Sequence, residues 1–247
     1  MDYLEIMANV LELEAQSLKK AQGHLSVELG EKLANLFISL RAEKGRLVVS
    51  GVGKSGIIAK KIAATFQSLG LGSYFLHPTE ALHGDLGLVE KGDALILISK
   101  SGNTEELLKL LPFLDIPEEK RIGLLGSVDS KLGEQCGIVL DCSVEAEACI
   151  NNLAPTTSTT LALAMGDALS VLYENIVGLS KEDFAENHPA GLGRALRLKV
   201  KDVMWKATDC PFVGPGATLQ EIIIEMTKIP LGGLAVLDQG QFVGIIV

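Results

Sequence analysis

The chain has 247 residues, of which 47% are hydrophobic, so it can bury a large core in one or two domains. Its formal net charge of -9 and isoelectric point of about 5.0 argue against a broad nucleic-acid surface, because such surfaces depend on clustered lysine and arginine. Any phosphate site must therefore be local.

The first twenty residues mix acidic and apolar side chains at helical spacing and lack the basic and apolar regions of a signal peptide. The longest apolar runs, such as residues 94–98, are far shorter than the roughly 20 residues that span a bilayer. The four cysteines form no C-x-x-C pair, which favours partly buried thiols over disulfides or a zinc site. We therefore expect a soluble, cytoplasmic protein with no membrane or nucleic-acid partner.

Apolar residues at helical spacing predict two helices before the first strand, over residues 4–18 and 29–40. From Arg46 onward, short apolar runs alternate with glycine-containing turns and helical periods. The expected strands are residues 47–50, 74–76, 94–98, 122–125 and 138–140. This alternation predicts an α/β fold: an open parallel five-stranded sheet with helices on both faces. A long helix over about residues 157–177, preceded by hydroxyl caps, closes the unit.

The pattern changes again after Gly191 and Gly193. A short strand near residues 211–213, an amphipathic helix over 218–228 and two strands near 232–237 and 242–247 are expected. We predict a first domain over residues 1–195 and a second over residues 200–247. The final strand pattern has no turn or cap after it, so we expect the second domain to be incomplete; a complete small appendage is the alternative.

The segment Gly51-Val52-Gly53-Lys54-Ser55-Gly56 follows a predicted strand and enters a helix. A Walker A loop would need glycine at position 48, which is Val48. The segment fits the dinucleotide fingerprint G-x-G-x-x-G, but the second strand ends at Leu76-His77-Pro78 rather than at the acidic residue that would hold a ribose. What remains is a glycine loop at a helix start, which favours an anion. A tight turn without a ligand is the alternative.

A second loop, Ser99-Lys100-Ser101-Gly102-Asn103-Thr104, follows the strand over residues 94–98 and precedes a helix near Glu105. Its three hydroxyls, its glycine and the helix start would suit a phosphate group. In open α/β sheets, ligands bind outside the carboxyl ends of the strands, where both loops would lie. The pair predicts a site for a small phosphorylated ligand, and with both nucleotide motifs excluded we favour a sugar phosphate.

Six motifs in chain order carry a resemblance to a known family. They are residues 51–56, His77-Pro78, residues 80–87, 99–106, 154–160 and His188-Pro189-Ala190-Gly191. With these motifs the chain resembles the sugar isomerase (SIS) family, and within it the arabinose-5-phosphate isomerases. The tail resembles the start of the paired CBS regulatory modules that follow the SIS domain in these enzymes, here truncated.

The resemblance implies reversible conversion of D-arabinose 5-phosphate and D-ribulose 5-phosphate through an enediolate, feeding synthesis of the lipopolysaccharide sugar Kdo. It also implies a homotetramer. Moving a carbonyl between C1 and C2 needs a base for a carbon-bound proton and a group that supports the enediolate oxygen. No redox cofactor is needed, so we expect none.

The resemblance also assigns residues. It implies four catalytic positions, Lys54, Glu106, Glu147 and His188. We favour Glu106 as the base, His188 as an aid to proton movement between oxygens and Lys54 as the partner of the oxyanion. The implied substrate-binding residues are Ser55, Gly70, Leu71, His77, His83, Ser99, Ser101, Thr104, Thr156 and Thr157. His77 can also meet zinc in the family, so zinc there is an expectation of the resemblance.

Departures and alternatives stay open. Lys100 stands where a small polar residue is common in the family, Asn103 replaces a frequent Glu, and Ile150 replaces an expected Pro. Glu106 could be a first-turn acid that favours the helix dipole, and Glu147 a solvated acidic turn. The alternative functions are a SIS enzyme for another sugar phosphate and a non-catalytic sugar-phosphate sensor.

Overall fold

The computed structural model describes residues 2–206, 208–228 and 231–247. The chain divides into two compact units, residues 1–196 and 197–247, which are described separately here. The division falls beside the boundary that the sequence pattern predicts, between residues 195 and 200.

The first unit is built on a five-stranded parallel sheet, as expected. The strands are β1 (Leu47–Gly51), β2 (Ser73–Phe75), β3 (Ala94–Ser99), β4 (Arg121–Leu125) and β5 (Ile138–Asp141), in the order β2-β1-β3-β4-β5. Gly51 pairs with Ile98, so the loops that follow β1 and β3 leave the sheet side by side. The strand order reverses between these two strands, and such a switch point is where open α/β sheets bind ligands.

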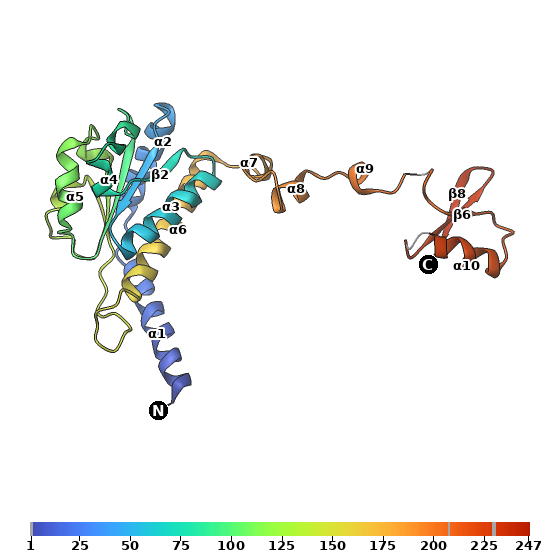
Figure 1. The fold of residues 1–247 in the computed structure, drawn as a ribbon, viewed down its shortest axis with the longest axis horizontal. Coiled ribbons are helices and arrows are strands. Elements are labelled where there is room, and N and C mark those ends of the chain that lie inside the picture. Colours follow the sequence, from blue (N-terminus) through green and yellow to red (C-terminus); the bar gives the residue numbers. More distant parts are fainter. Residues whose placement is uncertain (1, 207, 229–230) are drawn as a thin grey trace. The chain divides into compact units, whose positions relative to one another are not determined.

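Helices cover both faces of this sheet (Figure 1). One face carries α1 (Tyr3–Gln22), α2 (Val27–Ala42), α3 (Lys54–Ser68) and α6 (Thr157–Val177). The other carries α4 (Pro78–Ala81) and α5 (Glu105–Leu110). Strands β1, β3 and β4 are buried along their full length, which explains their nearly continuous apolar sequences.

Short 3₁₀ helices complete the connections of this unit: η1 (Asp85–Leu88), η2 (Leu111–Phe113), η3 (Glu118–Lys120) and η4 (Gly133–Gln135).

The two helices at the start of the chain, α1 and α2, each begin at a residue whose side chain caps the helix. Asp2 accepts from the amides of Leu4 and Glu5, and Ser26 accepts from the amide of Leu29.

Helix α6 is long and apolar enough to cross a membrane by length and composition. In the structure it packs against α1, α2 and α3. The Tyr173 ring lies 5.7 Å from Phe37 and 6.0 Å from Phe66, so aromatic packing joins three helices. Its apolar composition is therefore accounted for by its place in the core.

Two further helices, α7 (Lys181–Asn187) and α8 (Leu192–Arg197), follow α6. The second unit contains α9 (Val200–Val203), α10 (Leu219–Lys228) and a three-stranded sheet of β6 (Phe212–Val213), β7 (Leu234–Asp238) and β8 (Gln241–Ile246). Helix α10 packs against β6 and β7, so the predicted strand-helix-strand-strand order of the tail is confirmed.

Candidate active site

The loop after β1 exposes the start of a helix. Gly53 has a φ of +61°, a conformation that costs other residues about 1–2 kcal/mol. It caps α3 without a side-chain hydrogen bond, so in the described structure no side-chain acceptor caps the first amides of this helix. Lys54, the first residue of α3, is exposed, and the described part of the chain gives its ammonium no ion-pair partner.

The loop after β3 is held in shape by its own hydroxyls. The Ser99 and Thr104 hydroxyl oxygens lie 2.7 Å apart, and the Gly102 amide donates to Ser99 Oγ at 3.0 Å. Gly102 has a φ of +65°, and a Cβ there would lie 2.1 Å from Ser130 Oγ. Only glycine fits at this position, which explains its place among the hydroxyls.

A cavity of about 40 Å³ opens between these loops and the start of α6. Its polar lining is Ser55, Ser99, Lys100, Ser158 and Thr159. Its apolar lining is Ile58, Ile98, Leu124, Cys142, Pro155 and Ala162. The Ser158 and Thr159 hydroxyls already donate to Glu147 and to the Thr156 carbonyl. The Lys100 ammonium and the Ser55 and Ser99 hydroxyls can still donate hydrogen bonds to an anionic oxygen, so the cavity suits a small anion.

Glu106 lies on the first turn of α5, directly after the hydroxyl-containing loop of residues 99–104. Its side chain is exposed and has no hydrogen-bond or ion-pair partner in the described part of the chain. The neighbouring Glu105 is engaged instead, with Lys109 at 3.0 Å. Glu106 therefore keeps both carboxylate oxygens available, as a general base requires.

His77 and His83 flank α4, which follows β2. His77 caps α4, its Nδ1 accepting from the Thr79 amide at 3.3 Å, and α4 packs against α5, which carries Glu106. The Ser50 hydroxyl donates to the Leu76 carbonyl at 2.7 Å and fixes this junction to β1. Within the described ranges, no group of three or more His, Cys, Asp or Glu side chains could hold a metal. A single chain thus does not fit the zinc that the resemblance implies at His77.

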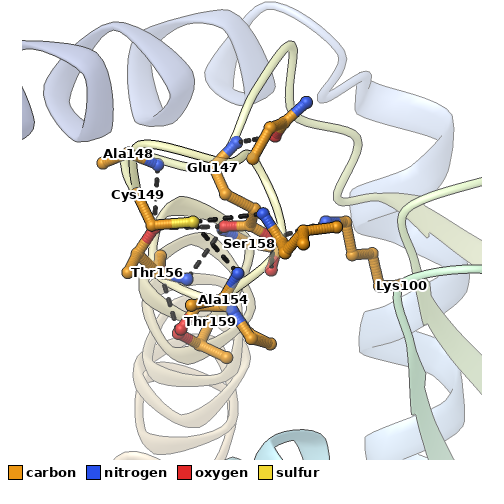
Figure 2. A network of polar contacts seen from close by, with 11 residues as sticks. Lys100, Glu147, Ala148, Cys149, Ala154, Thr156, Ser158 and Thr159 are labelled. Atoms are coloured by element: carbon orange, nitrogen blue, oxygen red, sulfur yellow. Dashed lines mark hydrogen bonds and ion pairs between the residues drawn. The ribbon is translucent and has the colours of Figure 1, made fainter.

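Glu147 is only 3% exposed, so it is not the solvated acid of a surface turn that the sequence allowed as an alternative. Its carboxylate accepts from the amides of Thr156 (2.8 Å) and Ser158 (3.1 Å) and from the Ser158 hydroxyl. Lys100 Nζ lies 2.6 Å from Glu147 Oε1 (Figure 2). Burial acts to raise the pKa of Glu147, but hydrogen bonds from Lys100, Ser158 and Thr156 outweigh it and lower that pKa to about 2.

The two threonines assigned to substrate binding belong to this network or to the core. The Thr156 hydroxyl accepts from the Ala148 amide at 2.9 Å and contacts Glu147 at 3.3 Å (Figure 2). Thr157 is fully buried, and its hydroxyl has no partner in the described structure. The next two residues, Ser158 and Thr159, line the cavity instead.

Three predicted site residues lie at the opposite edge of the sheet. His188 caps the end of α7, where its ring stacks on Phe184 at 3.9 Å. The adjacent Asn187 reaches the Ser68 carbonyl at the last turn of α3, and Gly70 and Leu71 line a pocket with it. Lys54 begins the same 15-residue helix, so about 20 Å separates the two edges. One chain therefore does not bring His188, Gly70 and Leu71 together with the other predicted residues.

Sequence reasoning missed three polar side chains that line the cavity, Lys100, Ser158 and Thr159. Ser158 and Thr159 belong to the same hydroxyl-rich segment as the predicted Thr156 and Thr157. Which of these four side chains face the cavity depends on the exact residue at which α6 begins, and the sequence pattern does not fix that residue. Lys100 was noted only as a departure from the family pattern. Its contact with Glu147, 47 residues away, has no signal in local sequence.

The fold and the paired loops are those of a SIS domain, and residues 39–172 match the SIS domain family. Residues 200–247 match the CBS domain family. Both family assignments from the motifs are thereby confirmed.

Known proteins define the group more narrowly. Arabinose 5-phosphate isomerase KdsD of Pseudomonas aeruginosa is 42% identical over 247 residues, covering 99% of this chain and 74% of the relative. Arabinose 5-phosphate isomerase GutQ of Escherichia coli is 44% identical over 227 residues, covering 89% of this chain and 69% of the relative. The solved structure of an Escherichia coli protein in complex with arabinose 5-phosphate has a TM-score of 0.63 at 37% identity, covering 76% of this chain and 100% of that one. The chain belongs to the SIS family, in the group that contains these arabinose 5-phosphate isomerases.

Proposed function

We propose that this chain is an aldose-ketose isomerase that interconverts D-arabinose 5-phosphate and D-ribulose 5-phosphate. One observation carries the proposal: a hydroxyl-lined cavity lies at the β1/β3 switch point, and the side chains of Lys54 and Glu106 on the adjoining helix starts have no partner among the described residues. A binding protein would need the cavity alone. The free carboxylate and ammonium supply what proton transfer requires.

The reaction moves two protons and one electron pair within the sugar. Glu106 removes the proton from C2 of the aldose, and the C–H electrons form the C1–C2 double bond of an enediolate. Lys54 stabilises the negative charge that develops on the C1 oxygen. Return of a proton to C1, with transfer of a proton from the C2 oxygen to the C1 oxygen, gives the ketose. The electrons never leave the substrate, so we propose a reaction that requires no redox cofactor.

His188 fits this scheme only through a second copy of the chain. Its ring Nδ1 lies 2.8 Å from the Phe184 carbonyl, which leaves Nε2 for proton transfer, yet it stands at the far edge of its own sheet. We propose a homotetramer in which a neighbouring copy brings His188, Gly70 and Leu71 to the Lys54 edge. Closed symmetric assemblies place the same donated edge at every site.

We place the protein in the cytoplasm, without nucleic-acid or membrane partners. A pentose phosphate isomerase of this kind would feed the synthesis of Kdo and hence of lipopolysaccharide. The single domain matched by residues 200–247 would adjust this activity rather than perform it.

The test is a coupled assay for ribulose 5-phosphate formed from arabinose 5-phosphate by the purified chain, with no nucleotide and with a chelator present. Turnover in both directions is the expected result. Folded protein that binds inorganic phosphate but turns over neither pentose phosphate would overturn the proposal. Turnover of a hexose or amino-sugar phosphate instead would reassign the substrate, and none at all on such a panel would favour a sensor.

A further inference from the structure

Lys100 is an unusual member of the anion cavity. It lies in the hydroxyl loop between Ser99 and Ser101, and it lines the cavity together with Ser55, Ser158 and Thr159. Its side chain is 48% exposed, so a ligand in the cavity can reach it. Among the described side chains that line this cavity, it carries the only positive charge.

Glu147 holds this ammonium in place. Its two oxygens accept from Ser158, from the Thr156 and Ser158 amides and from Lys100, so the carboxylate is fixed at the start of α6 (Figure 2). A carboxylate with this many donors stays ionised and is poorly placed to take a proton from carbon. Its contacts indicate that it acts through Lys100.

The charges of the two side chains decide what the cavity can bind. An ionised, buried Glu147 beside the cavity would repel a phosphate dianion, and Lys100 offsets that charge. An ammonium has three N–H donors, and the bond to Glu147 occupies one. Two donors remain for phosphate oxygens, which prefer such charge-assisted hydrogen bonds.

We infer that Lys100 binds the phosphate group of the sugar directly, as a specificity-determining residue for the dianion, and that Glu147 is the positioning residue that aims it. The identity of the sugar rests on the proposed function; the phosphate contact does not. Lys54 and Glu106 lie outside the lining of this cavity, so the phosphate end and the reacting end of the substrate have separate cations.

The test measures binding of inorganic phosphate to the full chain by calorimetry and, where turnover is seen, by competitive inhibition. Lys100→Met should weaken phosphate binding about ten- to hundredfold, the range for hydrogen bonds to charged groups. Lys100→Arg should recover most of the loss, because it keeps the charge. The control is Lys109→Met, which removes an equivalent surface ion pair on α5 and should leave phosphate binding unchanged.

A second pair of variants separates direct contact from simple neutralisation of Glu147. In a Glu147→Gln background, adding Lys100→Met should still weaken phosphate binding, because the ligand loses its own partner. If Lys100 only offset the charge of Glu147, adding Lys100→Met in that background would have no effect, and the inference would be wrong. Unchanged phosphate binding in the single Lys100→Met variant would overturn it as well. Because these measurements need no turnover, they stay decisive even if the isomerase assay fails.

Discussion

The two edges of the parallel sheet carry different parts of the predicted site. At the carboxyl edge, Lys54, Ser99, Glu106 and Glu147 lie around one switch point, and Lys54 and Glu106 have no side-chain partner within the described ranges. At the amino edge, His188 follows Asn187, which lines a polar pocket of about 450 Å³ together with Gly70. One chain places the anion cavity and the Glu106 carboxylate together at the carboxyl edge. Under the proposed function, His188 joins Lys54, Glu106 and Glu147 only from the amino edge of a second copy.

A second difference lies within the carboxyl edge, between its two acids. Glu106 is exposed and unengaged in the described structure, whereas Glu147 is buried and fully hydrogen-bonded. Both match family positions, yet only the first has an oxygen to spare. The role of an acid therefore follows from its available oxygens more than from its place in a motif.

The largest expected effect is on Glu106. Replacing Glu106 by Gln removes the base and should lower kcat about 10²- to 10⁴-fold, with phosphate binding within twofold or so of wild type. Steady-state kinetics and phosphate calorimetry measure the two quantities. The matched control is Glu105→Gln, which loses only its surface pair with Lys109 and should keep its turnover. Equal losses of binding and turnover at Glu106 would give it a structural role.

The next prediction joins the two edges. His188→Asn alone should lower kcat about 10²-fold, since it removes a proton-transfer group. Co-expression of Glu106→Gln and His188→Asn chains should then restore about a quarter of wild-type activity, because random pairing leaves one site in four with both groups intact. Coupled assay of the purified mixture measures it.

The control for this mixture combines Glu106→Gln with Lys54→Met. Both residues belong to the same edge of the same chain, so no pairing can rebuild an intact site. Activity restored by this control would mean that Lys54 and Glu106 act from different chains. No recovery in the His188 mixture would place His188 outside the site.

Most of the fold follows from the sequence, because it depends on local patterns. The buried strands read as apolar runs between glycine turns, and β1, β3 and β4 lie within one residue of their predicted bounds. The hydroxyls before α6 predicted the start of that helix at Thr157. Strand order was not predicted, because pairing partners far apart in sequence leave no local pattern.

The site was predictable only in part, for the same reason. Motif positions gave Lys54, Ser99 and Glu106, which share the switch point. The burial of Glu147 depends on a fold-back of the chain that brings Lys100 to it, and the separation of His188 depends on where α7 docks. Neither follows from the spacing of residues.

Glu147 should also be visible in acid stability. Its pKa is lowered to about 2 in the folded chain, so its stabilisation is fully present above the unfolded pKa near 4.5 and is lost as the pH falls toward 2. The shift corresponds to about 3 kcal/mol. Between about pH 5 and pH 3, the free energy of unfolding measured with urea should therefore fall more steeply in wild type than in Glu147→Gln.

Circular dichroism is the suitable probe for this comparison, since Trp205, the one tryptophan of the chain, belongs to the second unit. The control is Glu145→Gln, an exposed acid paired with Lys20, which should follow the wild-type curve. If the free energy of unfolding of Glu147→Gln falls with pH as steeply as that of wild type, the Glu147 carboxylate does not have the lowered pKa that its contacts indicate.

The smallest expected effect is at Gly70, on the amino edge. Its φ of +81° disfavours a side chain, and a Cβ would lie 3.2 Å from the flexible end of Asn187, so Gly70→Ala should cost about 1–2 kcal/mol of stability. Gly30→Ala, in an open helical position of α2, should instead stabilise by up to about 1 kcal/mol. Phosphate binding should be unchanged in both, because the phosphate cavity lies at the carboxyl edge. A marked loss of phosphate affinity in Gly70→Ala alone would mean that the amino edge of a second copy also contacts the phosphate. Phosphate binding could then no longer be assigned to the carboxyl edge alone.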